Sequence, residues 1–123
     1  MAGQCGQTIN PYSVAFSGAR TASEFSTNQF RVELRRGVYN GALWVWIRST
    51  VLSGSNYQWG STVELNTPCG TVKGLPYGSG DNWDVGASRC SPAICLGTPV
   101  SYTTVVFSGA ASGSNASKTA RVI

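Results

Sequence analysis

The chain of 123 residues contains no histidine, a single methionine and few charged residues, which make up 11% of the total. Without histidine, the Ser-His and Cys-His pairs of many hydrolases and every zinc site with a histidine ligand are excluded. No apolar run approaches the roughly 18 residues that a membrane-spanning helix needs. The hydrophobic share of 41% is still enough for a packed core, and the length suits a single domain, residues 1–123.

Acidic residues are also scarce: the five carboxylates belong to Glu24, Glu33, Glu64, Asp81 and Asp84. A glycosidase needs two carboxylates facing one cleft, one of them with a raised pKa, whereas an arginine partner expected for Glu33 favours its ionised form. Asp81 and Asp84 do not have the spacing of an EF-hand loop, so a hydrogen-bonded turn is a simpler interpretation than a calcium site. We therefore expect no enzyme activity, no cofactor and no metal.

Four cysteines in a short chain with 15 glycines favour two disulfides and an oxidising compartment. Of the three possible pairings we expect Cys5–Cys69 and Cys90–Cys95, the second closing a small loop. A zinc site of four thiolates is the alternative, but no pair of cysteines has the two-residue spacing of a zinc knuckle. The expected location is extracellular, or the surface of a cell or virion, although no apolar signal segment precedes Cys5.

Alternation of apolar and polar residues, with a period of two, dominates the sequence. The runs with this pattern, or rich in β-branched and aromatic residues, are 12–17, 30–35, 42–52, 57–65, 100–107 and 119–123. Residues 21–24 form a capping box that predicts at most one short helical turn. The composition of 109–118 is typical of a flexible segment. Together these features predict an all-β, antiparallel β-sandwich, Ig-like or jelly-roll-like, of about six to eight strands with little or no helix.

The dipeptide Asn40-Gly41 predicts a β-hairpin, because both central residues of a type I′ turn have positive φ. A two-residue loop pairs Tyr39 with Ala42 and sorts the side chains of 30–51 onto two faces. One face is almost wholly apolar and is expected to be the core side. It carries Phe30, Val32, Leu34 and Val38 opposite Val51, Ser49, Ile47 and Leu43. Arg36 also points to this side and is expected at the edge of the core.

The other face of the hairpin combines charge with aromatic rings. Glu33 lies opposite Arg48 as a cross-strand ion pair, Arg35 lies beside Trp46, and Trp44 is expected over Gly37. Two interpretations stay open: the indoles are covered by a loop or terminus, or they form an exposed aromatic platform. A register error, which would turn the indoles into the core, is the third. The candidate ligand-binding residues are Trp44, Trp46, Arg35, Tyr39, Arg48, Trp83 and Tyr77.

The sequence thus favours a non-catalytic binding domain that recognises carbohydrate or a protein surface through an aromatic and arginine-bearing sheet face. One alternative is a self-associating structural subunit of a capsid, pilus or surface layer. Another is a secreted inhibitor or toxin acting through residues 66–99, a long connection rich in turn residues. Nucleic acid is a less favoured partner, because the net charge is only +4 and no basic run extends beyond Arg35-Arg36.

Overall fold

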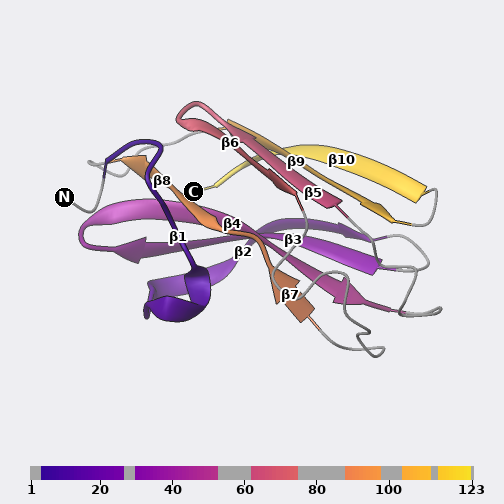
Figure 1. The fold of residues 1–123 in the computed structure, drawn as a ribbon, viewed down its shortest axis with the longest axis horizontal. Coiled ribbons are helices and arrows are strands. Elements are labelled where there is room, and N and C mark those ends of the chain that lie inside the picture. Colours follow the sequence, from indigo (N-terminus) through magenta and orange to yellow (C-terminus); the bar gives the residue numbers. More distant parts are fainter. Residues whose placement is uncertain are drawn as a thin grey trace.

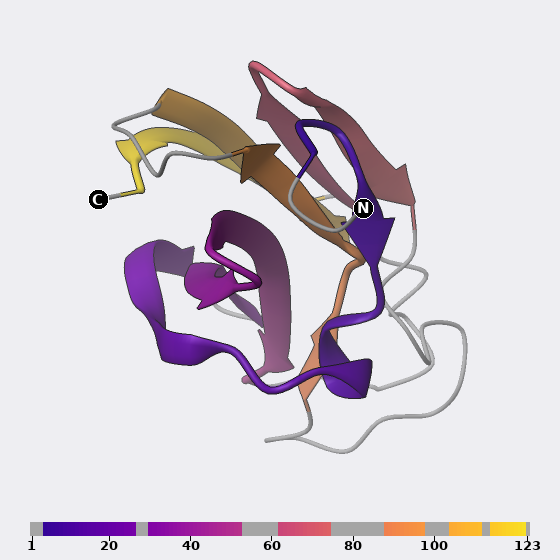
Figure 2. The ribbon, with the colours of Figure 1, turned by 90° about the vertical axis from the view of Figure 1, so that its left-hand side faces the viewer.

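A computed structural model describes residues 4–26, 30–52, 62–74, 88–97, 104–111 and 114–122. They form two antiparallel sheets that face each other (Figures 1 and 2). The predicted antiparallel β-sandwich is therefore confirmed, with ten strands, several of them very short, in the described residues. The single short helix among them is a 3₁₀ turn, Pro11–Ser13, and within these ranges no helix has the length and apolar character needed to cross a bilayer.

The larger sheet has the strand order β1-β8-β4-β3-β2, and β7 also pairs with β4. Its strands are β1 (Thr8–Ile9), β2 (Ser17–Ser26), β3 (Phe30–Tyr39), β4 (Ala42–Val51), β7 (Ser88–Cys90) and β8 (Ala93–Gly97). The smaller sheet has the order β10-β9-β5-β6. Its strands are β5 (Thr62–Thr67), β6 (Gly70–Gly74), β9 (Thr104–Ala111) and β10 (Ser114–Arg121).

The β3–β4 hairpin follows the predicted register from Tyr39↔Ala42 to Phe30↔Val51 without a shift. Asn40 and Gly41 have φ of 52° and 74°, the backbone conformation that this turn requires. The apolar face of the hairpin lies between the sheets, as predicted. Its core cluster is Phe30, Val32, Leu34, Leu43, Val45 and Ile47 from the hairpin with Leu65, Val72, Ile94, Val105, Phe107 and Val122.

Arg36 lies at the edge of this core, half-buried, as the hairpin pattern predicted. Burial lowers the pKa of its guanidinium, and the charge of neighbouring Arg20 lowers it further. Its Nε atom is buried and has no hydrogen-bond partner among the described residues. The long aliphatic stem lets the charged head approach water from a core position.

Two predictions of local structure near the N-terminus are wrong. Residues 21–24 are part of strand β2, which pairs with β3 through two register shifts. Bulges of this kind break the strict alternation by which an edge strand is recognised in a sequence. The strand expected over 12–17 is not formed before Ser17, where β2 begins. Tyr12 and Ser13 instead belong to the 3₁₀ turn Pro11–Ser13, because Pro11 starts it and the side chain of Asn10 accepts a hydrogen bond from the Tyr12 amide.

Residues 66–99 are not one long connection. Strands β6, β7 and β8 all lie in this segment, and β8 is buried against β4 in the centre of the larger sheet. The described residues of 109–118 likewise lie in strands β9 and β10 and not in a linker. Tyr77, Asp81, Trp83 and Asp84, together with 57–61, lie outside the described residues.

The Cys5–Cys69 disulfide is confirmed, whereas Cys90 and Cys95 are free thiols. Both β7 and β8 pair with β4, so Cys90 lies opposite Arg48 and Cys95 opposite Trp44. These two partners are four positions apart along β4, which corresponds to about 13 Å, and the two cysteines beside them are separated by a similar distance. A disulfide needs Cα atoms less than about 7 Å apart, so the predicted Cys90–Cys95 bond is wrong.

The two sheets are joined at both of their open sides. On one side, Lys118 of β10 donates from Nζ to the backbone carbonyl of Glu24 in β2 at 3.1 Å. On the other, the disulfide ties Cys5, which precedes β1, to Cys69 in the turn between β5 and β6. Residues 4–16, here called the N-terminal strap, are thereby held against the larger sheet.

Candidate functional site

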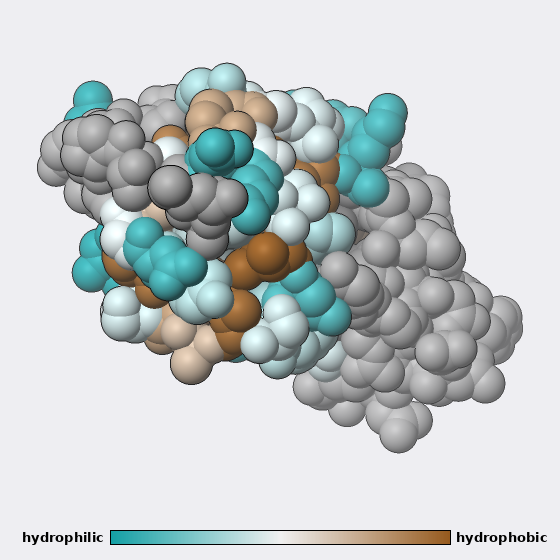
Figure 3. Space-filling model, turned by 60° about the vertical axis from the view of Figure 1, so that its left-hand side comes forward, coloured by the Kyte–Doolittle hydropathy of each residue, from teal (hydrophilic) through white to brown (hydrophobic). Residues whose placement is uncertain are grey.

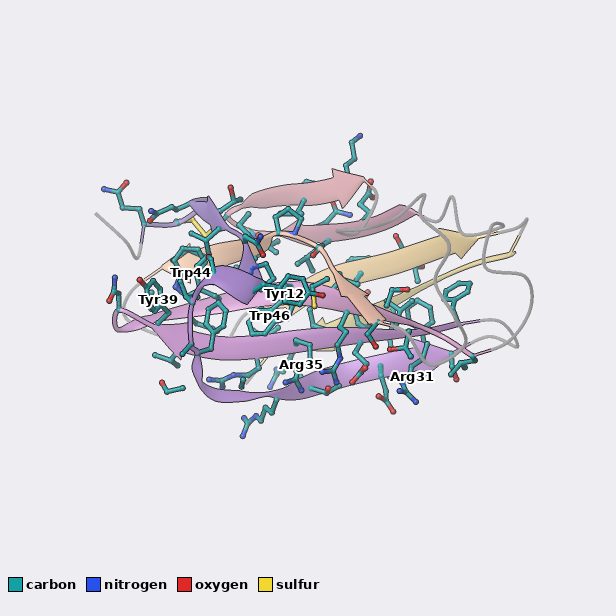
Figure 4. All side chains as sticks on the ribbon, turned by 60° about the horizontal axis from the view of Figure 1, so that its bottom comes forward. Tyr12, Arg31, Arg35, Tyr39, Trp44 and Trp46 are labelled. Atoms are coloured by element: carbon teal, nitrogen blue, oxygen red, sulfur yellow. A yellow bond between two sulfur atoms is a disulfide. The ribbon has the colours of Figure 1, made fainter. Side chains whose placement is uncertain are left out.

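The outer face of the larger sheet carries the hairpin residues on which the functional hypothesis depends. The strand register places Arg31, Glu33 and Arg35 opposite Thr50, Arg48 and Trp46, and Gly37 and Tyr39 opposite Trp44 and Ala42. Figure 4 shows the labelled aromatic side chains together towards the hairpin turn, with Arg35 and then Arg31 farther along β3. The face therefore has an aromatic half (Tyr39, Ala42, Trp44, Trp46) and an arginine half (Arg31, Glu33, Arg35, Arg48).

The aromatic half is buried. Trp44 is 0% exposed and Trp46 is 5% exposed, and both belong to a second apolar cluster with Ala42, Cys90, Ala93 and Cys95. The strap covers this cluster with Phe16, whose ring stacks on Trp46 at a centroid distance of 4.4 Å. The exposed aromatic platform is therefore wrong, and the alternative of indoles covered by a terminus is confirmed.

Gly37 explains how the strap fits so closely. A Cβ atom at this position would lie 2.6 Å from the Cβ of Phe16. The space left by the missing side chain is thus filled by Phe16, and not by Trp44 as the sequence suggested. The Trp44 indole instead donates from Nε1 to the backbone carbonyl of Tyr39 at 3.1 Å, which satisfies its only polar group.

Main-chain hydrogen bonds fix the strap at the far edge of β8. The amide of Gly6 donates to the carbonyl of Cys95 at 2.9 Å, and the amide of Cys95 donates to the carbonyl of Gln7 at 2.8 Å. The β1–β8 pairing continues this contact. The thiol of Cys95 lies beneath it, fully buried, and desolvation raises its pKa. On the face seen in Figure 3, small hydrophobic patches lie among hydrophilic and near-neutral residues.

The arginine half is organised around Glu33, which is only 5% exposed. Arg48 donates to both of its carboxylate oxygens, from Nε at 3.0 Å and from Nη2 at 2.9 Å. Thr21 donates its hydroxyl at 2.7 Å, and the Nε of Arg31 lies 3.7 Å away. Desolvation alone would raise the pKa of Glu33, but the hydrogen bonds from Arg48 and Thr21 and the charges of both arginines lower it on balance.

Arg35 completes the cluster. Its Nη1 donates to the hydroxyl of Thr21 at 3.1 Å, so that Thr21 links it to Glu33. Burial and the like charge of Arg48 lower the pKa of Arg35, although the carboxylate of Glu33 partly offsets both. The side chains of Arg31 and Arg48 stay 41% and 36% exposed. Positive charge is in excess, because three guanidiniums face two carboxylates, Glu33 and the exposed Glu24 paired with it across β2 and β3.

Cys90 and Tyr12 lie where the arginine half meets the strap. Cys90 is 6% exposed and pairs with Arg48 across β7 and β4. Burial raises the pKa of its thiol, and this effect outweighs a hydrogen bond from Tyr12 and the nearby charges of Arg48 and Arg35. A buried thiol with a raised pKa is a poor nucleophile. Among the described residues, no group of three His, Cys, Asp or Glu side chains could hold a metal ion.

Of the predicted ligand-binding residues, Arg35 and Arg48 come together at the surface, whereas Trp44 and Trp46 are buried and Tyr39 is half-buried beside the strap. Sequence reasoning overlooked Arg31, Thr21 and Tyr12 as members of this site. Alternation along β3 did place Arg31 on the correct face. Thr21 and Tyr12 carried no such signal, because one lies in a bulged strand and the other was assigned to a strand instead of a turn.

Comparisons with known proteins leave the family of this chain open. No protein-family model matches it, and no curated protein matches it. Among solved structures, the chain is similar to the GAE domain of GGA2p from Saccharomyces cerevisiae, with a TM-score of 0.40 and 10% sequence identity. The similarity covers 85% of this chain and 95% of that domain. A likeness at this level says nothing about function.

Proposed function

We propose that the chain is an extracytoplasmic, non-catalytic binding domain that recognises an anionic ligand through the arginine half of the larger sheet. The observation that carries this proposal is the grouping of three arginines around one buried carboxylate. Arg48 and Arg31 pair with Glu33 directly, and Arg35 is linked to it through Thr21. A guanidinium has five N–H donors. The side chains of Arg31 and Arg48 stay 41% and 36% exposed, so part of each guanidinium can be reached by a ligand.

The geometry supports a rigid site. Glu33 fixes Arg48 through a bidentate pair, and Thr21 fixes Arg35 relative to the same carboxylate. Side chains that are ordered before binding lose little conformational entropy when a ligand arrives. Like charges held close together also repel one another, and an incoming anion relieves that repulsion. Both effects favour anion binding at this surface.

Two further observations support the absence of catalysis and the proposed compartment. The carboxylate of Glu33 has a lowered pKa and is held ionised by its partners, which disqualifies it as a general acid. The Cys5–Cys69 disulfide is typical of proteins in an oxidising environment. Both support a binding role outside the reducing cytosol.

The experiment compares dextran sulfate with uncharged dextran in calorimetric titrations at low and moderate salt. We expect binding of the sulfated polymer alone, weakening as the salt concentration rises. Arg31→Gln and Arg35→Gln should each weaken binding about tenfold, the loss for one charge-assisted hydrogen bond. Arg48 is left unchanged, because removing it would strand the buried Glu33.

The matched control is Arg121→Gln, which removes the same charge from an exposed position on β10 of the other sheet. It should change the affinity less than about twofold, since at this distance it acts on the arginine half only through long-range electrostatics. Equal losses for Arg35→Gln and Arg121→Gln would show that the net charge of the chain, and not this site, attracts the polymer. Binding of uncharged dextran would also contradict the proposal.

A further inference from the structure

Tyr12 is 60% exposed, and among the described residues only one other large hydrophobic side chain, Val106, is clearly exposed. The remaining aromatic side chains of the strap and of the aromatic half pack on one another, with Phe16 on Trp46 and Tyr39 against Trp44. An exposed aromatic ring beside a cluster of guanidiniums is a combination that a merely structural turn does not need.

The position of the Tyr12 ring is fixed at both ends. At the backbone, its amide donates to the side chain of Asn10 at 2.9 Å, and the hydroxyl of Ser13 donates to the Asn10 carbonyl at 2.6 Å. Pro11 restricts the first residue of the turn. At the other end, the phenol lies close enough to the Cys90 thiol for its hydrogen bonding to lower the pKa of that thiol, against the larger effect of burial. The ring is thus held in place while much of its surface faces solvent.

This ring borders the arginine half. Cys90, which the phenol approaches, pairs with Arg48 across the strands, and the charges of both Arg48 and Arg35 lower the pKa of Cys90. In the view of Figure 4, Tyr12 appears next to Trp46, and Arg35 follows farther along β3. An aromatic face and two guanidiniums therefore lie within reach of one small ligand.

The two kinds of group recognise different parts of one molecule. A planar guanidinium matches a planar carboxylate through two parallel hydrogen bonds. An exposed tyrosine ring offers an apolar face, while its hydroxyl lies at the edge of the ring. The apolar face of a pyranose ring can pack against that aromatic face. A hexuronate sugar carries both features, since its carboxylate is attached directly to the pyranose.

We infer that Tyr12, Arg35 and Arg48 form a subsite for a uronate residue of an acidic polysaccharide, an inference that rests on the proposed function. The carboxylate lies against the two guanidiniums, and the sugar ring lies on the face of Tyr12. A peptide of acidic residues alone would use the guanidiniums but would offer no sugar ring to lie on Tyr12. The contribution of Tyr12 therefore separates the two classes of ligand.

The experiment measures the affinity of the intact chain for tetragalacturonate, tetraglutamate and maltotetraose, which supply sugar with charge, charge alone and sugar alone. We expect tetragalacturonate to bind at least about tenfold more tightly than either of the others. Tyr12→Ala should remove most of that advantage, and Tyr12→Phe, which keeps the ring, should retain it. Circular dichroism and thermal melts of both variants verify that they fold.

Each other outcome overturns a defined part of the scheme. If tetraglutamate binds as tightly as tetragalacturonate, or Tyr12→Ala weakens both equally, the uronate subsite is wrong while anion binding by the arginines stands. If maltotetraose binds as tightly as tetragalacturonate, the guanidiniums do not contribute to binding the carboxylate, and the uronate subsite is wrong. If neither anion binds and dextran sulfate also fails to bind, the proposed function itself is wrong.

Discussion

Replacing both Cys5 and Cys69 with serine removes the covalent bond that holds the strap to the smaller sheet. The two residues are 64 positions apart in the sequence. In the chain-entropy model, a cross-link that closes a loop of this length stabilises the folded state by about 4 kcal/mol at 25 °C. A domain of this size has only about 5–15 kcal/mol of stability in total, so the double variant should unfold at a much lower urea concentration.

Without the disulfide, the strap should also open locally more often than the rest of the domain. The amide of Cys95 donates to Gln7 of the strap, whereas the amide of Ile47 donates to the side chain of Ser91, outside the strap. In the double variant, hydrogen exchange should therefore speed up more at Cys95 than at Ile47. Local opening of the strap precedes global unfolding when its contacts are the weaker set.

Urea unfolding followed by tryptophan fluorescence, together with hydrogen exchange measured by NMR, provides both readouts. Cys90→Ala is the matched control, because it removes a buried cysteine that forms no disulfide. It should cost far less stability than the loss of the disulfide. An unchanged urea midpoint in the double variant would refute the loop-closure reasoning, and equal acceleration at Cys95 and Ile47 would refute the independent opening of the strap.

Three further predictions concern the face beneath and beside the strap. Gly37→Ala should lower the free energy of unfolding by about 1–3 kcal/mol, because the new Cβ would lie 2.6 Å from Phe16; a loss within the error of urea titrations would contradict this close contact. The thiols of Cys90 and Cys95 should react with Ellman's reagent only after denaturation, since burial raises the pKa of each; rapid reaction in the native state would show that they are accessible. The lowered pKa of Glu33 stabilises the fold above the unfolded-state value of about 4.3, and this contribution is lost as the pH falls through the folded-state pKa. Glu33→Gln should therefore show a smaller loss of stability between neutral and acidic pH, and parallel pH profiles for the two proteins would be the contradicting result.

The hairpin could be predicted from the sequence residue by residue. Asn40-Gly41 specifies the turn, the turn specifies the register, and the period of two assigns each side chain to a face. Glu33 and Arg48 consequently meet as expected. These are local rules, and they hold wherever a strand pair is regular.

Whether a face is covered could not be predicted in the same way. The indoles of Trp44 and Trp46 are buried because residues 4–16, distant in sequence, lie over them. That contact depends on the Cys5–Cys69 disulfide and on the space above Gly37. No periodicity encodes a contact of this kind.

The wrong disulfide has a related cause. Sequence proximity of Cys90 and Cys95 suggested a small closed loop, but β7 and β8 both extend along β4. An extended chain carries neighbouring cysteines apart, not together. The bulged strand β2 escaped detection for another reason, since its register shifts interrupt the alternation that marks its neighbours.

The most direct test of the account is an NMR titration that observes the Nε–Hε signals of the arginine side chains as a short dextran sulfate is added. We expect the signals of Arg31, Arg35 and Arg48 to shift saturably, while those of Arg20 and Arg121 change little. Shifts of similar size at all of these arginines, or largest at Arg121, would show that the ligand is attracted by net charge alone and that the arginine half of the sheet is not a binding site.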